Sequence, residues 1–172
     1  MAFAYILFFV IAAVSYYVQY SFQKKFKKYS SKSLGVNMTG KDVAERMLRD
    51  YGVNDVKVTF TQGSLSDHYN PTNKTVNLSE AVFATNSIAA AAVAAHECGH
   101  AIQHATGYAP LQLRSKLVPV VSFASTWMQW ILLIGILTIQ VFPQILTVGV
   151  ALFACTTIFA FITLPVEINA SV

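Results

Sequence analysis

Residues 117–166 read LVPVVSFASTWMQWILLIGILTIQVFPQILTVGVALFACTTIFAFITLPV and contain no Asp, Glu, Lys or Arg. Residues 1–23 are also uncharged, whereas nineteen of the chain's twenty charged residues lie between Lys24 and Lys116. A helix of about 20 apolar residues crosses a bilayer, so both segments are long enough to span it. With 55% hydrophobic and 12% charged residues, the chain is predicted to be an integral membrane protein with a small aqueous domain between its spans.

The net charge of +4 does not indicate a nucleic-acid-binding protein. Five of the 12 basic residues form one run directly after the first apolar segment, at Lys24, Lys25, Lys27, Lys28 and Lys32. Such a run is typical of a topology signal that faces anionic headgroups on the cytoplasmic side. Because it follows the apolar segment instead of preceding it, residues 1–23 are predicted to be an uncleaved anchor with an outer N-terminus. We therefore expect the lipid bilayer as a partner, and no nucleic acid.

The long uncharged stretch is predicted to form two further spans, residues 117–142 and 144–165, with a hinge at the proline between them. Arg114 and Lys116 mark the cytoplasmic entry to the first of these spans. Three crossings that start outside return Glu167, the last charged residue, to the cytoplasm.

The intervening residues carry signals for a small α+β domain. Thr39 and Asp42 can cap a helix whose apolar stripe ends before Gly52. DVKVTF and TVNL indicate two short strands, and the turn at Asn70-Pro71 suggests a hairpin or a sheet of two to three strands. A second helix is expected from Ser87 to Thr106, with Asn86 or Ser87 as its cap and Gly107 as its end.

This second helix contains His96-Glu97-Cys98-Gly99-His100, which matches the pattern His-Glu-x-x-His. Side chains four apart lie on one face of a helix, so both imidazoles can reach one metal ion. Two neutral nitrogen ligands with an open position are typical of catalytic zinc, and Glu97 is placed to act as the general base. The alternative is a helix whose histidines only satisfy hydrogen bonds.

Three stretches resemble the YugP-type membrane zinc metallopeptidases: AAHECGHAIQHATGYAPLQLRS, LSDHYNPTNKTVNLSE and LPVEINAS. The resemblance runs from MTGKDVAERML over nearly the rest of the chain. It implies a zincin-like domain, Zn²⁺ as cofactor, His96 and His100 as ligands and Glu97 as the base. By analogy with HtpX-like and CAAX prenyl proteases, it implies Glu167 as the third ligand.

The end of the chain departs from these relatives. They commonly carry an aspartate four residues after the ligand glutamate, whereas this chain has Ser171. They also run on into further helical sequence, so we expect the chain to be C-terminally truncated. The expected organisation is therefore an anchor, a cytoplasmic metallopeptidase domain, two spans and a third-ligand segment, at residues 1–23, 24–116, 117–166 and 167–172.

His104 competes with Glu167 as the third ligand, because it continues the spacing of His96 and His100. An unbroken helix rises about 1.5 Å per residue, which separates His96 from His104 by roughly 12 Å. One ion cannot comfortably bind all three histidines unless the helix breaks after His100, whereas a lone carboxylate at the end of an apolar helix is costly unless it is paired or metal-bound. Glu167 is therefore the predicted ligand.

Three further residues have open or minor roles. His68, and less so Tyr69, could donate a hydrogen bond to the oxyanion of a tetrahedral intermediate, or could stabilise a turn. Cys98 is predicted to be a small packing residue on another face of the helix. With only Cys98 and Cys155, the chain fits a reduced compartment.

The expected fold is thus a mainly α membrane protein with about three transmembrane helices and a small α+β cytoplasmic domain. The expected function is a membrane-anchored zinc endopeptidase that hydrolyses membrane-associated polypeptides at the cytoplasmic face of a bacterial cell membrane. The alternatives are a non-catalytic scaffold or pseudoprotease that binds metal, and proteolysis within the bilayer. The identity of the substrate is not encoded in these motifs.

Overall fold

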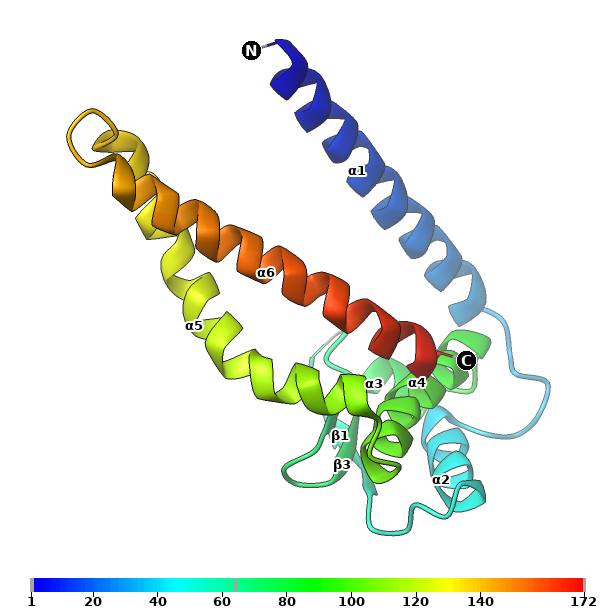
Figure 1. Ribbon diagram of the computed structural model, residues 1–172. Helices are drawn as coiled ribbons and strands as arrows, with labels where there is room; N and C mark the ends of the chain where they lie inside the picture. Colours follow the sequence, from blue (N-terminus) through cyan, green and yellow to red (C-terminus); the bar gives the residue numbers. More distant parts are fainter. Residues whose placement is uncertain (1, 64, 172) are drawn as a thin grey trace. The chain divides into compact units, whose positions relative to one another are not determined.

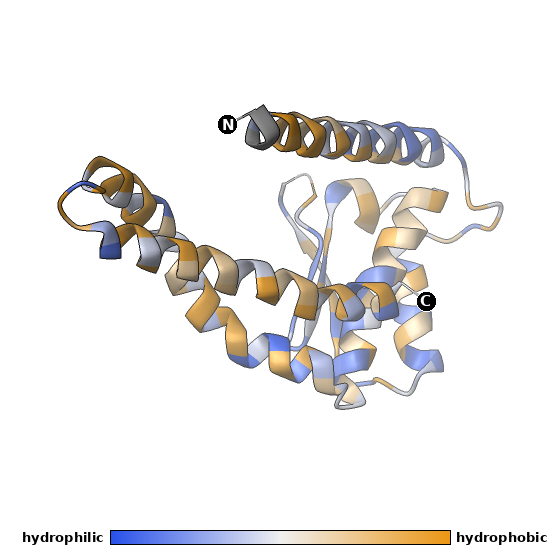
Figure 2. Cartoon of the chain, turned by 45° about the horizontal axis from the view of Figure 1, so that its top comes forward, coloured by the Kyte–Doolittle hydropathy of each residue, from blue (hydrophilic) through white to orange (hydrophobic). Residues whose placement is uncertain are grey.

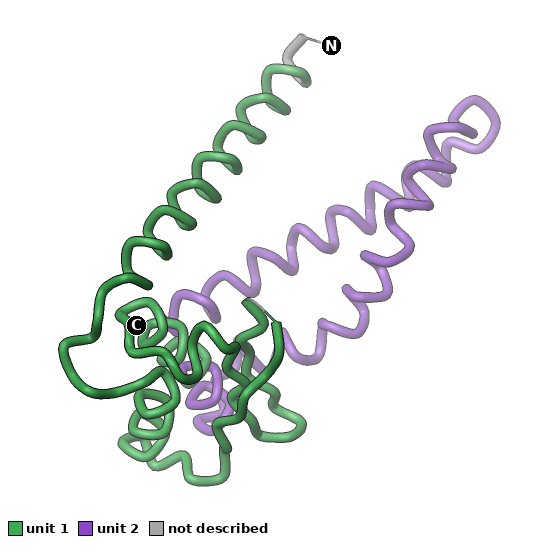
Figure 3. The backbone as a smooth tube through the Cα atoms, turned by 180° about the vertical axis from the view of Figure 1, so that it is seen from behind, with its two compact units in different colours: residues 1–98 green, residues 99–172 purple. Residues whose placement is uncertain are grey.

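The computed structural model describes residues 2–63 and 65–171. The outer limits of the first and last predicted segments, Met1 and Val172, lie outside these residues. The chain divides into two compact units, the first ending at Cys98 and the second beginning at Gly99 (Figure 3). The division falls within one helix, α4 (Ile88–Ala105), so each unit contains part of it.

Three long helices are long and apolar enough to cross a membrane, as the sequence predicts. They are α1 (Ala2–Ser30), α5 (Ala109–Leu137) and α6 (Pro143–Ala170). Figure 2 shows hydrophobic colour along most of α5 and α6, and a hydrophilic C-terminal part of α1 where the lysines lie. At about 1.5 Å per residue each helix exceeds the roughly 30 Å of a hydrocarbon core.

Helix α5 begins before the predicted span. It starts at Ala109, with a proline in its first turn, and therefore includes Arg114 and Lys116. Proline has no N–H and a helical φ, so the first turn of a helix is its favoured position. The basic residues accordingly lie on the same helix as the apolar span.

Helices α5 and α6 form a hairpin within the second unit (Figure 1). Phe142 N–H donates to the Thr138 carbonyl at 2.8 Å, and α6 begins at Pro143, where the hinge is predicted. A Cβ on Gly135 would lie 2.7 Å from the Leu146 backbone, so only glycine permits this approach. Small residues allow apolar helices to pack at such short range.

The first unit contains a three-stranded sheet in the order β1-β3-β2. Strands β1 (Lys57–Thr61) and β3 (Thr75–Ser79) are parallel, whereas β2 (His68–Asn70) pairs antiparallel to β3 across the predicted turn. The sequence predicts two of these strands by alternation. The third, β2, lies in a polar stretch without apolar alternation and is defined by its pairing with β3.

Helix α2 (Gly40–Asp50) covers the sheet and has the predicted capping box. Thr39 N–H donates to Asp42 at 2.8 Å, and this bond, followed by that of the Thr39 side chain, holds the pKa of Asp42 below its ordinary value. Helix α2 contributes to an apolar core that is fully buried. This core contains Ala44 from α2, Val76 and Leu78 from β3, and Val82 from the short helix α3 (Glu80–Phe83).

Helix α4 begins and ends where local signals predict. Ser87 Oγ accepts from Ala90 N–H at 3.1 Å, so Ser87 and not Asn86 is the cap. Asn86 instead binds the segment after α1, accepting from Leu34 N–H and donating to the Val36 carbonyl. The helix ends at Ala105, and Gly107 follows it with a φ of +68°, which favours glycine.

Candidate metal centre and active site

The motif residues occupy different faces of α4. His96 and His100 are one turn apart on this helix, and both are half-buried. Cys98 is fully buried, and its thiol donates to the Ala44 carbonyl of α2 at 3.6 Å. Burial, and then the charge of Glu97, raise the pKa of Cys98 to about 12. Cys98 therefore packs as a neutral thiol on the opposite side from the histidines, as the sequence predicts.

Glu167, near the end of α6, lies beside the second histidine of the motif. Its Oε2 is 3.4 Å from His100 Nε2. Its other oxygen, Oε1, accepts from Arg114 Nη1 of α5 at 2.9 Å. The carboxylate is therefore oriented by a guanidinium on one side and faces an imidazole on the other.

His96, His100 and Glu167 form a group that could hold a metal ion. Each offers one ligand atom, and these atoms lie within 4.8 Å of one another. Two imidazole nitrogens and one carboxylate oxygen are a donor set that suits zinc, and three protein ligands are typical of a catalytic centre. The residues that the sequence predicts as ligands thus fit a zinc ion by their chemistry and spacing.

His104 does not belong to this group. Helix α4 is unbroken through Ala105, and the His104 side chain is exposed. The break after His100 that a third histidine ligand would need is not present in this described helix. Glu167 thus belongs to the group with His96 and His100, whereas His104 does not.

The carboxylate of Glu97 is held by the sheet. The backbone N–H of Tyr69, in β2, donates to Glu97 Oε2 at 3.0 Å. Burial of the Tyr69 side chain, and then the charge of Asp55, raise the pKa of its phenol. The sequence predicts a role only for the side chain of Tyr69, because a backbone contact between residues 28 apart leaves no signal in the sequence.

Both ring nitrogens of His68 already have partners in the first unit. Nδ1 lies 2.8 Å from the Ser66 carbonyl, and Nε2 lies 3.2 Å from Asn77 Nδ2. A carbonyl only accepts, so Nδ1 carries the proton and Nε2 accepts from the amide. This arrangement favours the turn-stabilising role over a role as oxyanion donor.

Two residues near Glu167 carry no sequence signal that assigns them to the site. Arg114 is predicted only to mark the cytoplasmic entry to a span, and Gln103 lies in a helical stretch without a distinguishing pattern. Gln103 is only 4% exposed, although it is polar. A buried amide three residues after a candidate ligand can be recognised only once α6 is placed beside α4.

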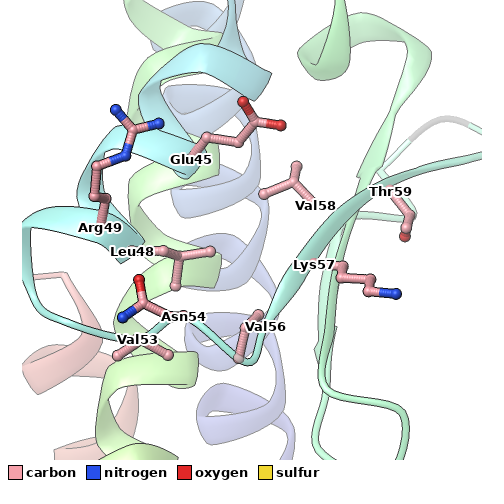
Figure 4. Close-up of a pocket in the computed structure, with 9 residues that line it drawn as sticks. All are labelled: Glu45, Leu48, Arg49, Val53, Asn54, Val56, Lys57, Val58 and Thr59. Atoms are coloured by element: carbon pink, nitrogen blue, oxygen red, sulfur yellow. The ribbon is translucent and has the colours of Figure 1, made fainter.

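A pocket of about 450 Å³ lies elsewhere in the first unit, between α2 and β1 (Figure 4). Its walls combine apolar and charged side chains: Glu45, Leu48, Arg49, Val53, Asn54, Val56, Lys57, Val58 and Thr59. None of the predicted ligands or catalytic residues lines it.

Comparison with known proteins shows the class of protein to which this chain belongs. It belongs to the family whose description reads "Putative neutral zinc metallopeptidase", and the match covers residues 4–172. One relative is "Putative membrane protease YugP" of Bacillus subtilis (strain 168). It is 42% identical over 167 residues, which cover 96% of this chain and 73% of that protein. No solved structure matches the chain.

Proposed function

We propose that this chain is a membrane-anchored zinc endopeptidase, with His96, His100 and Glu167 as ligands and Glu97 as general base. The observation that carries the proposal is the convergence of the three ligand atoms to within 4.8 Å of one another. Membership of a zinc metallopeptidase family supports peptide bonds as the substrate.

When bound, zinc would supply a Lewis acid that polarises the scissile carbonyl and makes water acidic enough to lose a proton near neutral pH. Glu97 accepts that proton as the attack proceeds and returns it to the leaving amine. The N–H of Tyr69, 3.0 Å from Glu97 Oε2, orients the carboxylate for both transfers. His96, His100 and Glu167 hold the ion without contributing protons.

The proposed location follows from the charges that flank the apolar helices. The lysine run at the end of α1 and the basic residues Arg114 and Lys116 early in α5 would both face the cytoplasm. Among the described helices α1, α5 and α6 meet the requirements of a span, so α4 is assigned to the aqueous side and not to the bilayer. We propose membrane-associated polypeptides at the cytoplasmic face of a bacterial membrane as substrates.

A structural zinc site is the rival interpretation. Such sites are usually closed by four protein ligands and favour cysteine. Here the thiol of Cys98 donates to the Ala44 carbonyl and lies on the opposite side of α4 from the histidines, so it does not supply a fourth ligand. Three ligands with an adjacent carboxylate therefore favour catalysis.

The test is metal analysis and proteolysis of purified protein in detergent, with labelled casein as the probe. Wild-type protein should contain about one zinc per chain. Glu97→Gln should keep the zinc and lose about 10²–10⁴-fold in rate, because it removes the base only. Glu45→Gln, on the exposed face of α2, is the matched control and should behave as wild type. Full activity in Glu97→Gln would contradict the mechanism, and a zinc-loaded but inactive wild type would favour the scaffold.

A further inference from the structure

The amide of Gln103 is buried between α4 and α6 and has every polar atom in contact. Its Nε2 lies 2.9 Å from the Val166 carbonyl and 2.8 Å from Asn169 Oδ1. Its Oε1 lies 3.2 Å from His100 Nδ1. Burying an amide costs free energy unless such bonds are made, so a glutamine used only for packing would be a poor choice here.

These contacts leave a single orientation for the amide. A backbone carbonyl can only accept, so the atom beside Val166 O must be the NH₂ of Gln103. The atom beside His100 is therefore the oxygen. This oxygen can only accept, so His100 Nδ1 must carry the proton.

The orientation of Gln103 thereby determines the tautomer of His100. A neutral imidazole that is protonated at Nδ1 has its lone pair on Nε2. This is the nitrogen that lies 3.4 Å from Glu167 Oε2, in the candidate ligand group. In free imidazole nothing fixes which nitrogen carries the proton. The tautomer that is protonated at Nε2 would direct an N–H at the metal.

The same amide also holds α6. Its two acceptors, Val166 and Asn169, flank Glu167 in the sequence. The Gln103 side chain thus connects α4, which carries His100, to the residues on either side of Glu167 in α6.

We propose that Gln103 is the positioning residue of the metal centre, which sets the Nδ1–H tautomer of His100 and holds Glu167 in register with it. This inference rests on the proposed zinc function. It goes beyond that function because it assigns a role to a residue outside the ligand set. Hydrogen-bond partners of metal ligands are typically worth 10–100-fold in metal affinity.

The experiment uses the full chain in detergent and three variants. Gln103→Met keeps the length and apolar stem but removes both hydrogen-bonding ends. Gln103→Glu keeps an oxygen acceptor for His100 Nδ1–H but places its second oxygen beside the Val166 carbonyl, where the amide NH₂ donates. Gln112→Met is the matched control, because Gln112 is exposed on α5 and outside this network. Circular dichroism of each protein checks that the helices form.

Two readouts are taken. Nitrogen-15 NMR of the histidine rings in metal-free protein reports the His100 tautomer, and chelator competition reports the zinc dissociation constant. Gln103→Met should lose the Nδ1–H preference and weaken zinc binding about 10–100-fold. Gln103→Glu should retain the tautomer but weaken zinc binding, because a carboxylate cannot donate to Val166 and Asn169, and Gln112→Met should match wild type.

An unchanged His100 tautomer in Gln103→Met would overturn the inference, and so would a zinc dissociation constant equal to that of wild type. Wild-type protein that binds no zinc would instead overturn the proposed function. The two failures are distinguishable because the tautomer is measured without metal.

Discussion

The backbones of Gly99 on α4 and Ala170 on α6 are in direct contact. A Cβ placed on Gly99 would lie 2.9 Å from Ala170 Cα and even closer to the Ala170 carbonyl oxygen. Side chains do not approach backbone atoms this closely, so glycine is required at this position. The fourth residue of the His-Glu-x-x-His motif therefore allows the end of α6, with Glu167, to reach the histidine helix.

Replacing Gly99 with alanine should separate these two helices. Helix propensity alone favours Gly99→Ala by about 1 kcal/mol. The clash with backbone should outweigh this gain, since overpacking costs about 1–3 kcal/mol and a helix backbone cannot rotate away. We expect a lower melting temperature and weaker zinc binding, measured by thermal unfolding and chelator competition. A more stable variant with unchanged zinc affinity would show that the contact is not needed.

The identity of the third ligand can be tested by two alanine variants. Glu167→Ala removes a carboxylate from the ligand group and should cost more zinc affinity than the roughly 10–100-fold typical of an indirect partner. His104→Ala should leave zinc content near that of wild type, because His104 is exposed on an unbroken helix. Metal analysis after dialysis measures both. The reverse pattern would show that α4 breaks after His100.

Cys98 should be unreactive in the folded protein. With a pKa of about 12, its thiolate is present at about one part in 10⁴ at pH 8, and only the thiolate is nucleophilic. In a Cys155→Ser background we expect slow labelling by a charged maleimide, and rapid labelling after denaturation. Mass spectrometry of the labelled protein gives the rate. Fast labelling of the native protein at pH 8 would contradict the burial of this side chain.

Membrane orientation can be measured with reporters at two positions. A reporter at residue 60 should lie in the cytoplasm, and one fused after Phe142 should lie outside, because positive charge lies at the end of α1 and early in α5. Accessibility to an impermeant reagent in intact cells reads out both. Finding residue 60 outside would place the site in an oxidising compartment and reverse the assignment.

Features that depend on neighbouring residues could be predicted from the sequence. The uncharged stretches predict the long helices, since spanning depends on apolar length. The capping box at Thr39 and the end of α4 at Gly107 are also predicted, because caps are formed within a few residues. The spacing of His96 and His100 places them on one helix face for the same reason.

Only the tertiary structure decided the contacts between distant segments. The strand β2 lacks apolar alternation and exists through its pairing with β3. The N–H that holds Glu97, the guanidinium beside Glu167 and the NH₂ of Gln103 each reach their partners across 28 residues or more. Helix caps and apolar periods are encoded in local hydrogen bonds and side-chain spacing, whereas these contacts exist only when packing brings separate elements together.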